Sequence, residues 1–355
     1  MRIALSYFVV VVAAAGCASE PPRIPDKDAD DALAAPFSGR FLVHDPERAD
    51  WKDRSFLLQL PENVDVDDDV GAPLLIVLHG GGGNAESAFS LACPGGNTSD
   101  EGCWSQLAER EGFVVVAPEG TPAHFFPNHR TWNAGGGGEQ RCTSGRACKE
   151  NVDDVAFFDA LLAEVQRGVR IDARRIFVAG MSNGAAMAHR LACERSTVVA
   201  AIGPVGGGNQ LQTVQGCNPA RPVPVLQLHG TADPCWRFGD DDDMGACERS
   251  ISAVPHVSIE ATIEGWCARN GCDELPAEDA VADDDDDDDD GLSSVRLSFA
   301  GCLDGADVEL VRTDGGGHTW PRGYPYLGEN VIGKTTTDFS ANELLWAFFV
   351  EHPLP

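Results

Sequence analysis

Three polar side chains that lie far apart in the sequence have the types and the chain order of a nucleophilic catalytic site. Ser182 stands at the centre of a Gly-x-Ser-x-Gly pentapeptide, and Asp233 and then His318 follow it along the chain. A serine hydroxyl becomes a nucleophile when an imidazole can take its proton, and a carboxylate fixes the tautomer of that imidazole and stabilises its charged form. The sequence therefore predicts Ser182 as nucleophile, Asp233 as acid and His318 as base.

Each of these residues follows an apolar run that predicts a β-strand. Ser182 lies between the apolar run 175–179 and the helix-forming run 185–192, which predicts a strand, a tight turn and a helix. Asp233 follows the run 223–228, and His318 follows the run 308–312 through three glycines. Gly180 and Gly184 fit a strained turn in which side chains would collide with the neighbouring strand and helix. A glycine-rich connection with an inert serine is the alternative.

Two other residues compete for the acid and base roles. His229 ends the run 223–228 and is the alternative base, although we expect it to form hydrogen bonds within its own loop. Asp154 is the alternative acid. It precedes Ser182 on a predicted helix, and we expect it to cap or anchor that helix.

A second glycine-rich segment offers donors for a developing negative charge. The run 74–78 predicts a buried strand, and His79 and four glycines follow it. Backbone N–H groups in such a loop can approach an oxyanion without obstruction by side chains. We expect the N–H groups of Gly81 and Asn183 to form an oxyanion hole. A phosphate-binding loop is the competing interpretation, but the Gly-Lys-Ser/Thr ending is missing.

Taken together, the motifs at 180–184, 229–234 and 316–321 resemble those of secreted polyhydroxybutyrate depolymerases and feruloyl or acetylxylan esterases, a family that includes LpqC-like bacterial lipoproteins. The resemblance runs from about Arg54 to the C-terminus, with insertions. It implies an α/β-hydrolase fold, hydrolysis of carboxylic esters and the same three catalytic positions. It also implies that Trp132, Asn133 and Trp320 line the substrate cleft. Ordinary aromatic packing is the alternative for the tryptophans.

Strand and helix signals alternate along the chain, which predicts a single α/β domain with a mostly parallel central sheet flanked by helices. We place the catalytic domain at 37–355, with Asp-rich loop insertions near 240–243 and 283–290. The expected strands are 55–60, 74–78, 113–117, 175–179, 198–205, 223–228 and 308–312, and the expected helices are 104–110, 151–166, 185–192, 259–268 and 342–351.

The first residues have the pattern of an export signal. Arg2 precedes the apolar run 3–15, which is too short to span a bilayer as a helix. Residues 14–17 resemble a lipoprotein cleavage site, so we expect a signal peptide over 1–16 and a lipid on Cys17. The usual leucine is missing, which leaves ordinary signal cleavage as the alternative. We expect 17–36 to be a flexible tether, and the protein to be an outer-membrane or cell-surface lipoprotein or to be secreted.

The 12 cysteines fit an exported, disulfide-stabilised enzyme better than a cytosolic one. Spacing alone does not fix connectivity, so the pairs are hypotheses, and Cys267 is left over. The spacings form no paired C-x-x-C set, so we expect no zinc or other metal. The expected pairs are Cys93–Cys103, Cys142–Cys148, Cys193–Cys217, Cys235–Cys247 and Cys272–Cys302, the last of which resembles the family pattern.

The formal net charge of −30 comes largely from aspartate runs at 65–69, 240–243 and 283–290. Such runs repel themselves, so we expect solvated, disordered insertions; a calcium site is the alternative. The charge argues against nucleic acids and polyanionic polysaccharides as partners.

These observations predict an exported serine esterase that needs no cofactor. Its expected partner is an ester substrate, either a polyester or an acylated plant cell-wall saccharide, and it would contact a membrane only through a lipid anchor. The alternatives are a serine peptidase of the same fold, because one fold hosts several chemistries, and an inactive acidic surface-binding lipoprotein.

Overall fold

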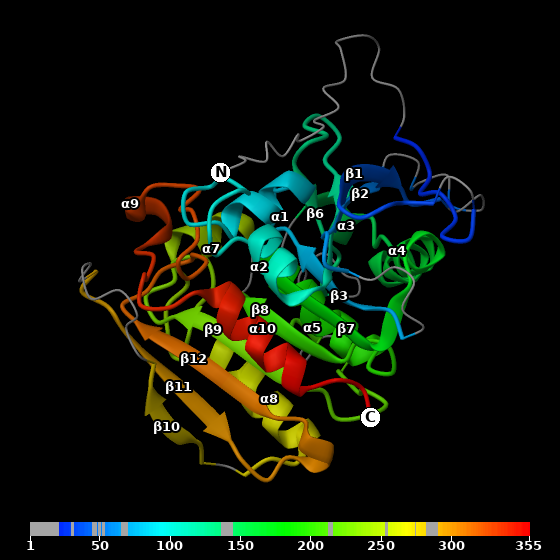
Figure 1. Cartoon of the computed structure of the whole chain (residues 1–355). Helices are drawn as coiled ribbons and strands as arrows, with labels where there is room; N and C mark the ends of the chain where they lie inside the picture. Colours follow the sequence, from blue (N-terminus) through cyan, green and yellow to red (C-terminus); the bar gives the residue numbers. More distant parts are fainter. Residues whose placement is uncertain are drawn as a thin grey trace, which may run out of the picture.

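The computed structural model describes residues 21–29, 32–44, 48, 51, 54–64, 70–135, 145–211, 216–252, 255–273, 275–281 and 290–355 (Figure 1). The predicted signal peptide, Cys17, Cys142, the aspartate run 65–69 and all but the last residue of the run 283–290 lie outside the described residues.

One large sheet forms the centre of the domain, in the strand order β1-β2-β4-β3-β7-β8-β9-β12-β11-β10. Its middle strands run parallel to one another: β4 (Val114–Pro118), β3 (Ala72–Leu78), β7 (Ile171–Met181), β8 (Ala201–Val205), β9 (Val225–Gly230) and β12 (Val308–Asp314). Antiparallel strands complete both edges: β1 (Phe37–Leu42) and β2 (Ser55–Leu60) at one, β11 (Ser293–Phe299) and β10 (Ala277–Ala280) at the other. The prediction of a mostly parallel sheet is confirmed.

Helices cover both faces of the sheet, because its middle strands carry apolar side chains on both faces. The middle strands are nearly continuous apolar runs because both of their faces are buried. In β3, Leu74 and Ile76 pack into one core and Leu75 and Val77 into the other, following the alternation of side chains along a strand. One face carries α4 (Asp154–Gly168), α5 (Asn183–Glu194) and α8 (Ile259–Asn270); the other carries α1 (Ala85–Leu91), α2 (Trp104–Glu111) and α10 (Ala341–Glu351) (Figure 1).

The remaining elements are short. They are the two-stranded pair β5 (Thr121–Pro122) and β6 (Arg130–Thr131), the helices α3 (Gly145–Lys149), α7 (Ala246–Ile251) and α9 (Glu329–Ile332), and a 3₁₀ turn (Leu303–Gly305).

Most predicted elements appear within a few residues of their expected bounds. The helix expected over 151–166 begins later, because Asn151 has a φ of 47° and the Asp153 side chain caps the helix by accepting the N–H of Ala156. The antiparallel edge strands β1, β10 and β11 were not predicted.

The expected flexible tether is wrong for residues 21–29. Ile24 is buried, with 1% of its surface exposed, and it packs against Gly168 at the end of α4. Arg167 donates to the Ile24 carbonyl, and Arg23 forms an ion pair with the buried Glu164, 2.5 Å apart. This part of the chain is therefore anchored to the helix layer.

Four of the expected disulfides are present, and they confirm the disulfide-stabilised fold: Cys93–Cys103, Cys193–Cys217, Cys235–Cys247 and Cys272–Cys302. Cys148 is disulfide-bonded, but its expected partner Cys142 lies outside the described residues. Cys267 is free and buried.

The aspartate run 240–243 is exposed, but it is not the disordered insertion that we expected. The N–H of Gly239 donates to the Asp242 carboxylate at 2.7 Å, and the Ser258 hydroxyl donates to Asp240 at 2.7 Å. These local bonds give the segment an ordered turn. Among the described residues, no helix has the length and apolar character needed to cross a membrane.

Candidate active site

Ser182 lies on a strained turn between β7 and α5. Its φ of 56° and ψ of −116° are unusual for a residue with a side chain, and its N–H donates to Val205 O, at the end of β8, at 2.8 Å. A Cβ on Gly180 would lie 2.6 Å from the carbonyl carbon of Gly184, and one on Gly184 would lie 2.4 Å from the Leu78 oxygen. Both positions therefore require glycine.

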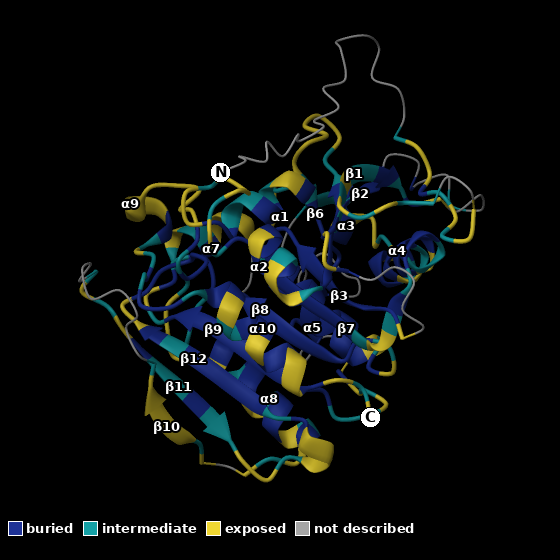
Figure 2. Ribbon diagram, in the orientation of Figure 1, coloured by how far each residue is buried: buried dark blue, intermediate teal, exposed yellow. Residues whose placement is uncertain are grey.

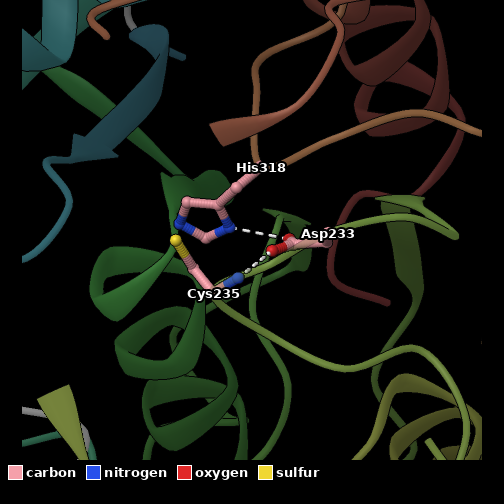
Figure 3. Close-up of side chains that lie close together, drawn as sticks. All are labelled: Asp233, Cys235 and His318. Atoms are coloured by element: carbon pink, nitrogen blue, oxygen red, sulfur yellow. Dashed lines mark hydrogen bonds and ion pairs between the residues drawn. The ribbon is translucent and has the colours of Figure 1, made fainter. Parts of the chain in front are cut away.

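Asp233 and His318 lie together after the ends of β9 and β12. His318 Nδ1 is 2.7 Å from Asp233 Oδ2, and both side chains are buried (Figure 3). The other carboxylate oxygen accepts the N–H groups of Cys235 and Trp236 at 2.7 and 2.9 Å. Burial opposes ionisation, but the charge and hydrogen bond of His318, the nearby His229 and the Cys235 N–H outweigh it and hold the pKa of Asp233 below its usual value.

The segment that follows β8 links this pair to the serine. A Cβ on Gly206 would lie 3.1 Å from Met181 Cε and 3.3 Å from His318 Nδ1. A Cβ on Gly207 would lie 2.4 Å from the carbonyl oxygen of Ser182. The His318 ring thus lies beside the turn that carries Ser182, so the structure brings the three predicted residues to the same edge of the sheet.

The glycine loop after β3 lies against the same turn. A Cβ on Gly80 would be 3.6 Å from Ser182 Cβ. The N–H of Gly82 donates to Arg130 O at 2.8 Å, and that of Gly83 donates to Gly80 O at 3.0 Å. For the N–H of the exposed Gly81, we find no acceptor among the described residues.

His79 holds this loop in place, a role that the sequence did not suggest. Its Nδ1 donates to Gly80 O at 2.8 Å and its Nε2 accepts the N–H of Gly120 at 3.0 Å, so the neutral ring has one tautomer. Burial lowers the pKa of His79 to about 3. The position directly before the glycines was the signal that could have identified it.

Asn183 begins α5 and is fixed through its side chain. Its Oδ1 accepts the Trp132 N–H at 2.7 Å, and its Nδ2 donates to the Trp132 carbonyl at 3.0 Å. These two bonds join the helix that follows the serine to the segment after β6.

The residues predicted to line the substrate cleft are buried side chains. Trp132, Asn133 and Trp320 have at most 2% of their surface exposed. Trp132 Nε1 donates to His79 O at 3.0 Å, and Trp320 Nε1 donates to the Asn342 side chain at 3.0 Å. These contacts favour a supporting role, since the polar atoms are already bonded to protein groups.

Asp154 belongs to a separate buried network. Its carboxylate lies 2.6 Å from Arg54 Nη1 and accepts the N–H of Asn133 at 2.6 Å. The Arg54 guanidinium in turn lies over the ring of Phe157, 3.3 Å from its centroid. Asp154 therefore anchors the start of α4, as expected.

His229 forms its hydrogen bond within its own loop. Its Nε2 is 2.9 Å from Trp236 O, which accepts the ring proton, and 3.4 Å from Asp233 Oδ2. Burial lowers the pKa of His229, so the neutral ring supports the acid loop.

Asp233, Cys235 and His318 also have ligand atoms within 4.8 Å of one another, a grouping that resembles a metal site (Figure 3). Cys235 is bonded to Cys247, however, and a disulfide sulfur cannot act as the thiolate ligand that metals require. The chemistry of this donor set therefore does not fit a metal ion.

The chain is similar in sequence to known esterases. Residues 55–215 match the family model for esterase PHB depolymerases. Over 280 residues, 76% of this chain and 72% of its relative, the chain is 29% identical to "Putative esterase NocK" of Nocardia uniformis subsp. tsuyamanensis. It is 26% identical over 254 residues to feruloyl esterase B of Piromyces equi, covering 70% of this chain but 40% of that protein.

A solved structure shares the fold. The acetyl xylan esterase from Aspergillus awamori matches with a TM-score of 0.53 at 13% identity, covering 88% of this chain and 98% of that one. At this identity the likeness concerns the fold alone. The chain is therefore a carboxylic-ester hydrolase with the α/β-hydrolase fold, similar over residues 55–215 to esterase PHB depolymerases and over 70% of its length to feruloyl esterase B.

Proposed function

We propose that this chain is an exported serine esterase that works through an acyl-enzyme, with Ser182 as nucleophile, His318 as general base and Asp233 as the carboxylate that orients it. The observation that carries the proposal is the buried 2.7 Å hydrogen bond between Asp233 and His318 beside the strained turn of Ser182. With Asp233 on Nδ1, the other ring nitrogen of His318 is left to take the proton of the serine.

The reaction has two halves. Ser182 Oγ attacks the ester carbonyl carbon while His318 Nε2 takes the hydroxyl proton, and the tetrahedral intermediate then expels the alcohol, which leaves with that proton. The acyl group stays on Ser182 Oγ. A water molecule attacks it, His318 again takes and returns a proton, and the carboxylic acid leaves.

The oxyanion of each tetrahedral intermediate would accept hydrogen bonds from the backbone N–H groups of Gly81 and Asn183. The proximity of Gly80 to Ser182 and the anchoring of Asn183 by Trp132 support this assignment. Donors held in place before the reaction stabilise developing charge without reorganisation at the moment of reaction.

Export is supported by the four described disulfides, which persist in oxidising compartments. The signal peptide and the lipid on Cys17 remain predictions from the sequence. We propose a polyester or an acylated plant cell-wall saccharide as substrate, since the relatives are named as feruloyl esterase and as esterase PHB depolymerase.

Ser182→Ala tests the proposal. Hydrolysis of p-nitrophenyl acetate should fall by about 10³-fold or more, because the nucleophile is gone. Ser38→Ala, at an exposed position on β1, is the matched control and should keep full activity. A Ser182→Ala protein that retains turnover within about tenfold of the wild type would contradict the proposal.

A further inference from the structure

The Cys235–Cys247 disulfide lies directly against the proposed catalytic pair. The N–H of Cys235 donates to Asp233 Oδ1 at 2.7 Å. The Cys235 sulfur, a ring nitrogen of His318 and a carboxylate oxygen of Asp233 all lie within 4.8 Å of one another, and all three residues are buried. Figure 3 shows the sulfur next to the His318 ring. One half of this disulfide is therefore part of the candidate active site.

Bonds other than the one between the two sulfurs hold Cys235 in this place. The N–H of Trp236, the residue after it, donates to Asp233 Oδ1 at 2.9 Å. The N–H of Glu248 on α7 donates to the carbonyl of Pro234, the residue before it, at 3.1 Å. When the disulfide opens, the residues on both sides of Cys235 are thus still bonded, and we expect the freed sulfur to keep its position.

A small thiol reaches this disulfide most easily from the side of Cys247. Cys247 is partly exposed on α7, whereas Cys235 is 2% exposed. The thiolate of a dithiol reductant attacks the Cys247 sulfur, the bond between the two cysteines breaks, and Cys235 leaves as a thiolate. The second thiol of the reductant then attacks the mixed disulfide and releases Cys247. Two electrons pass to the cysteines, and the dithiol becomes a disulfide.

Reduction turns a donor set that does not fit a metal ion into one that does. A thiolate, an imidazole nitrogen and a carboxylate oxygen are all ligands of zinc, and the thiolate favours soft cations. The charges of the thiolate and of Asp233 together balance a divalent cation. Ligand atoms in a tetrahedral zinc site lie about 3.5 Å apart, so side-chain shifts of about 1 Å bring these three donors together.

We propose that opening the Cys235–Cys247 disulfide creates an inhibitory site for Zn²⁺ or Cd²⁺, made of Cys235, His318 and Asp233. An ion on His318 Nε2 blocks the nitrogen that takes the serine proton, and an ion on Nδ1 replaces the bond to Asp233. The inhibition rests on the proposed function, but metal binding does not. The two are therefore measured separately.

The test compares Cys247→Ser, which keeps the sulfur of Cys235, with Cys235→Ser, which keeps that of Cys247. Both variants lose the disulfide and retain the free Cys267, so they differ only in which sulfur remains. Cd²⁺ is added to each protein under argon, and the ultraviolet charge-transfer band of a cadmium–thiolate bond is recorded. This band reports binding to sulfur, which the aspartate runs do not supply.

We expect a band that saturates at one equivalent of Cd²⁺ in Cys247→Ser, and no such band in Cys235→Ser or in the oxidised wild type. Adding His318→Gln to Cys247→Ser should weaken Cd²⁺ binding about tenfold or more. One equivalent of Zn²⁺ should abolish p-nitrophenyl acetate hydrolysis by Cys247→Ser, relative to its own activity before the metal is added, and a chelator should restore it.

Circular dichroism confirms that each variant folds. Wild type that is reduced with a dithiol and then freed of it repeats the test without a substitution, and alkylation with peptide mapping identifies the opened disulfides. The absence of the band in folded Cys247→Ser, an equal band in Cys235→Ser, or binding that His318→Gln leaves unchanged would overturn the proposal. Full activity with the metal bound would also overturn it. Normal ester hydrolysis by Ser182→Ala would instead contradict the proposed function and leave the metal site standing.

Discussion

Replacing Asp233 by Asn removes one charge at the centre of the site and leaves its shape intact. The Oδ1 atom can still accept the N–H groups of Cys235 and Trp236. The Oδ2 atom becomes an amide NH₂ that faces His318 Nδ1 at 2.7 Å, so two donors meet. The imidazole relieves this by moving its proton to Nε2, the nitrogen that must accept the proton of Ser182.

The size of the effect follows from this geometry. An imidazolium about 4 Å from a carboxylate gains about 4 kcal/mol at an effective dielectric constant of 20, and the variant loses this stabilisation when His318 becomes charged. That corresponds to about 10³-fold in kcat, and the wrong tautomer adds about another tenfold. We therefore expect Asp233→Asn to lower kcat by about 10³- to 10⁴-fold with a small change in KM.

The assay is steady-state hydrolysis of p-nitrophenyl acetate near neutral pH, with circular dichroism to confirm folding. Asp154→Asn is the matched comparison, since Asp154 is also buried and its carboxylate lies 2.6 Å from a cationic group. It should lose about 3 kcal/mol of stability, because Arg54 is left buried without its partner, yet keep kcat far above that of Asp233→Asn. The reverse order of activities in folded proteins would refute the assignment of the acid.

Two further predictions concern stability. Gly184→Ala should destabilise the fold by about 3 kcal/mol or more and abolish activity, because the new Cβ would overlap backbone atoms. Gly328→Ala, at an exposed position, is the control and should fold normally. Denaturant unfolding measures the stability of both variants. Burial lowers the pKa of His79 to about 3 and of His189 and His256 to about 4, from 6.5 in the unfolded chain. As the pH falls, the unfolded chain therefore binds protons on these histidines before the folded protein does. The free energy of unfolding should be highest above pH 6.5 and should fall by about 3 kcal/mol per histidine by pH 4. A denaturation midpoint that does not change between pH 6.5 and pH 4 would contradict this prediction.

The places of the three proposed catalytic residues in the fold were predictable because each depends on local sequence. The turn at Ser182 requires glycines on both sides, and this leaves a pattern that can be read without the fold. Asp233 and His318 follow recognisable apolar strands. Since parallel strands end at the same edge of a sheet, their order along the chain was enough to predict that they meet.

The supporting contacts were not predictable, because they join distant segments. The Arg54–Asp154 pair spans 100 residues, and nothing local in either segment marks it as buried. The burial of Trp132 follows from its bonds to Asn183, which only the folded chain brings together. A family resemblance identifies such residues as important without saying whether they touch a substrate or hold the residues that do.

The errors at the edges of the domain have a similar origin. Ile24 is a single apolar residue in a polar segment, so no periodicity reveals that it docks against α4. All four residues of β10 are exposed, and the strand is recognisable only through its pairing with β11 (Figure 2). Sequence periodicity detects burial, and these elements bury too little to produce it.

Labelling with a fluorophosphonate is the most direct test of the central claim, that His318 and Asp233 activate Ser182. A fluorophosphonate reacts with an activated serine and leaves a covalent adduct, which intact mass and peptide mapping can locate. We predict a single adduct on Ser182, formed rapidly in the wild type and lost in His318→Gln. An unlabelled folded protein, or an adduct on a different serine, would contradict the account.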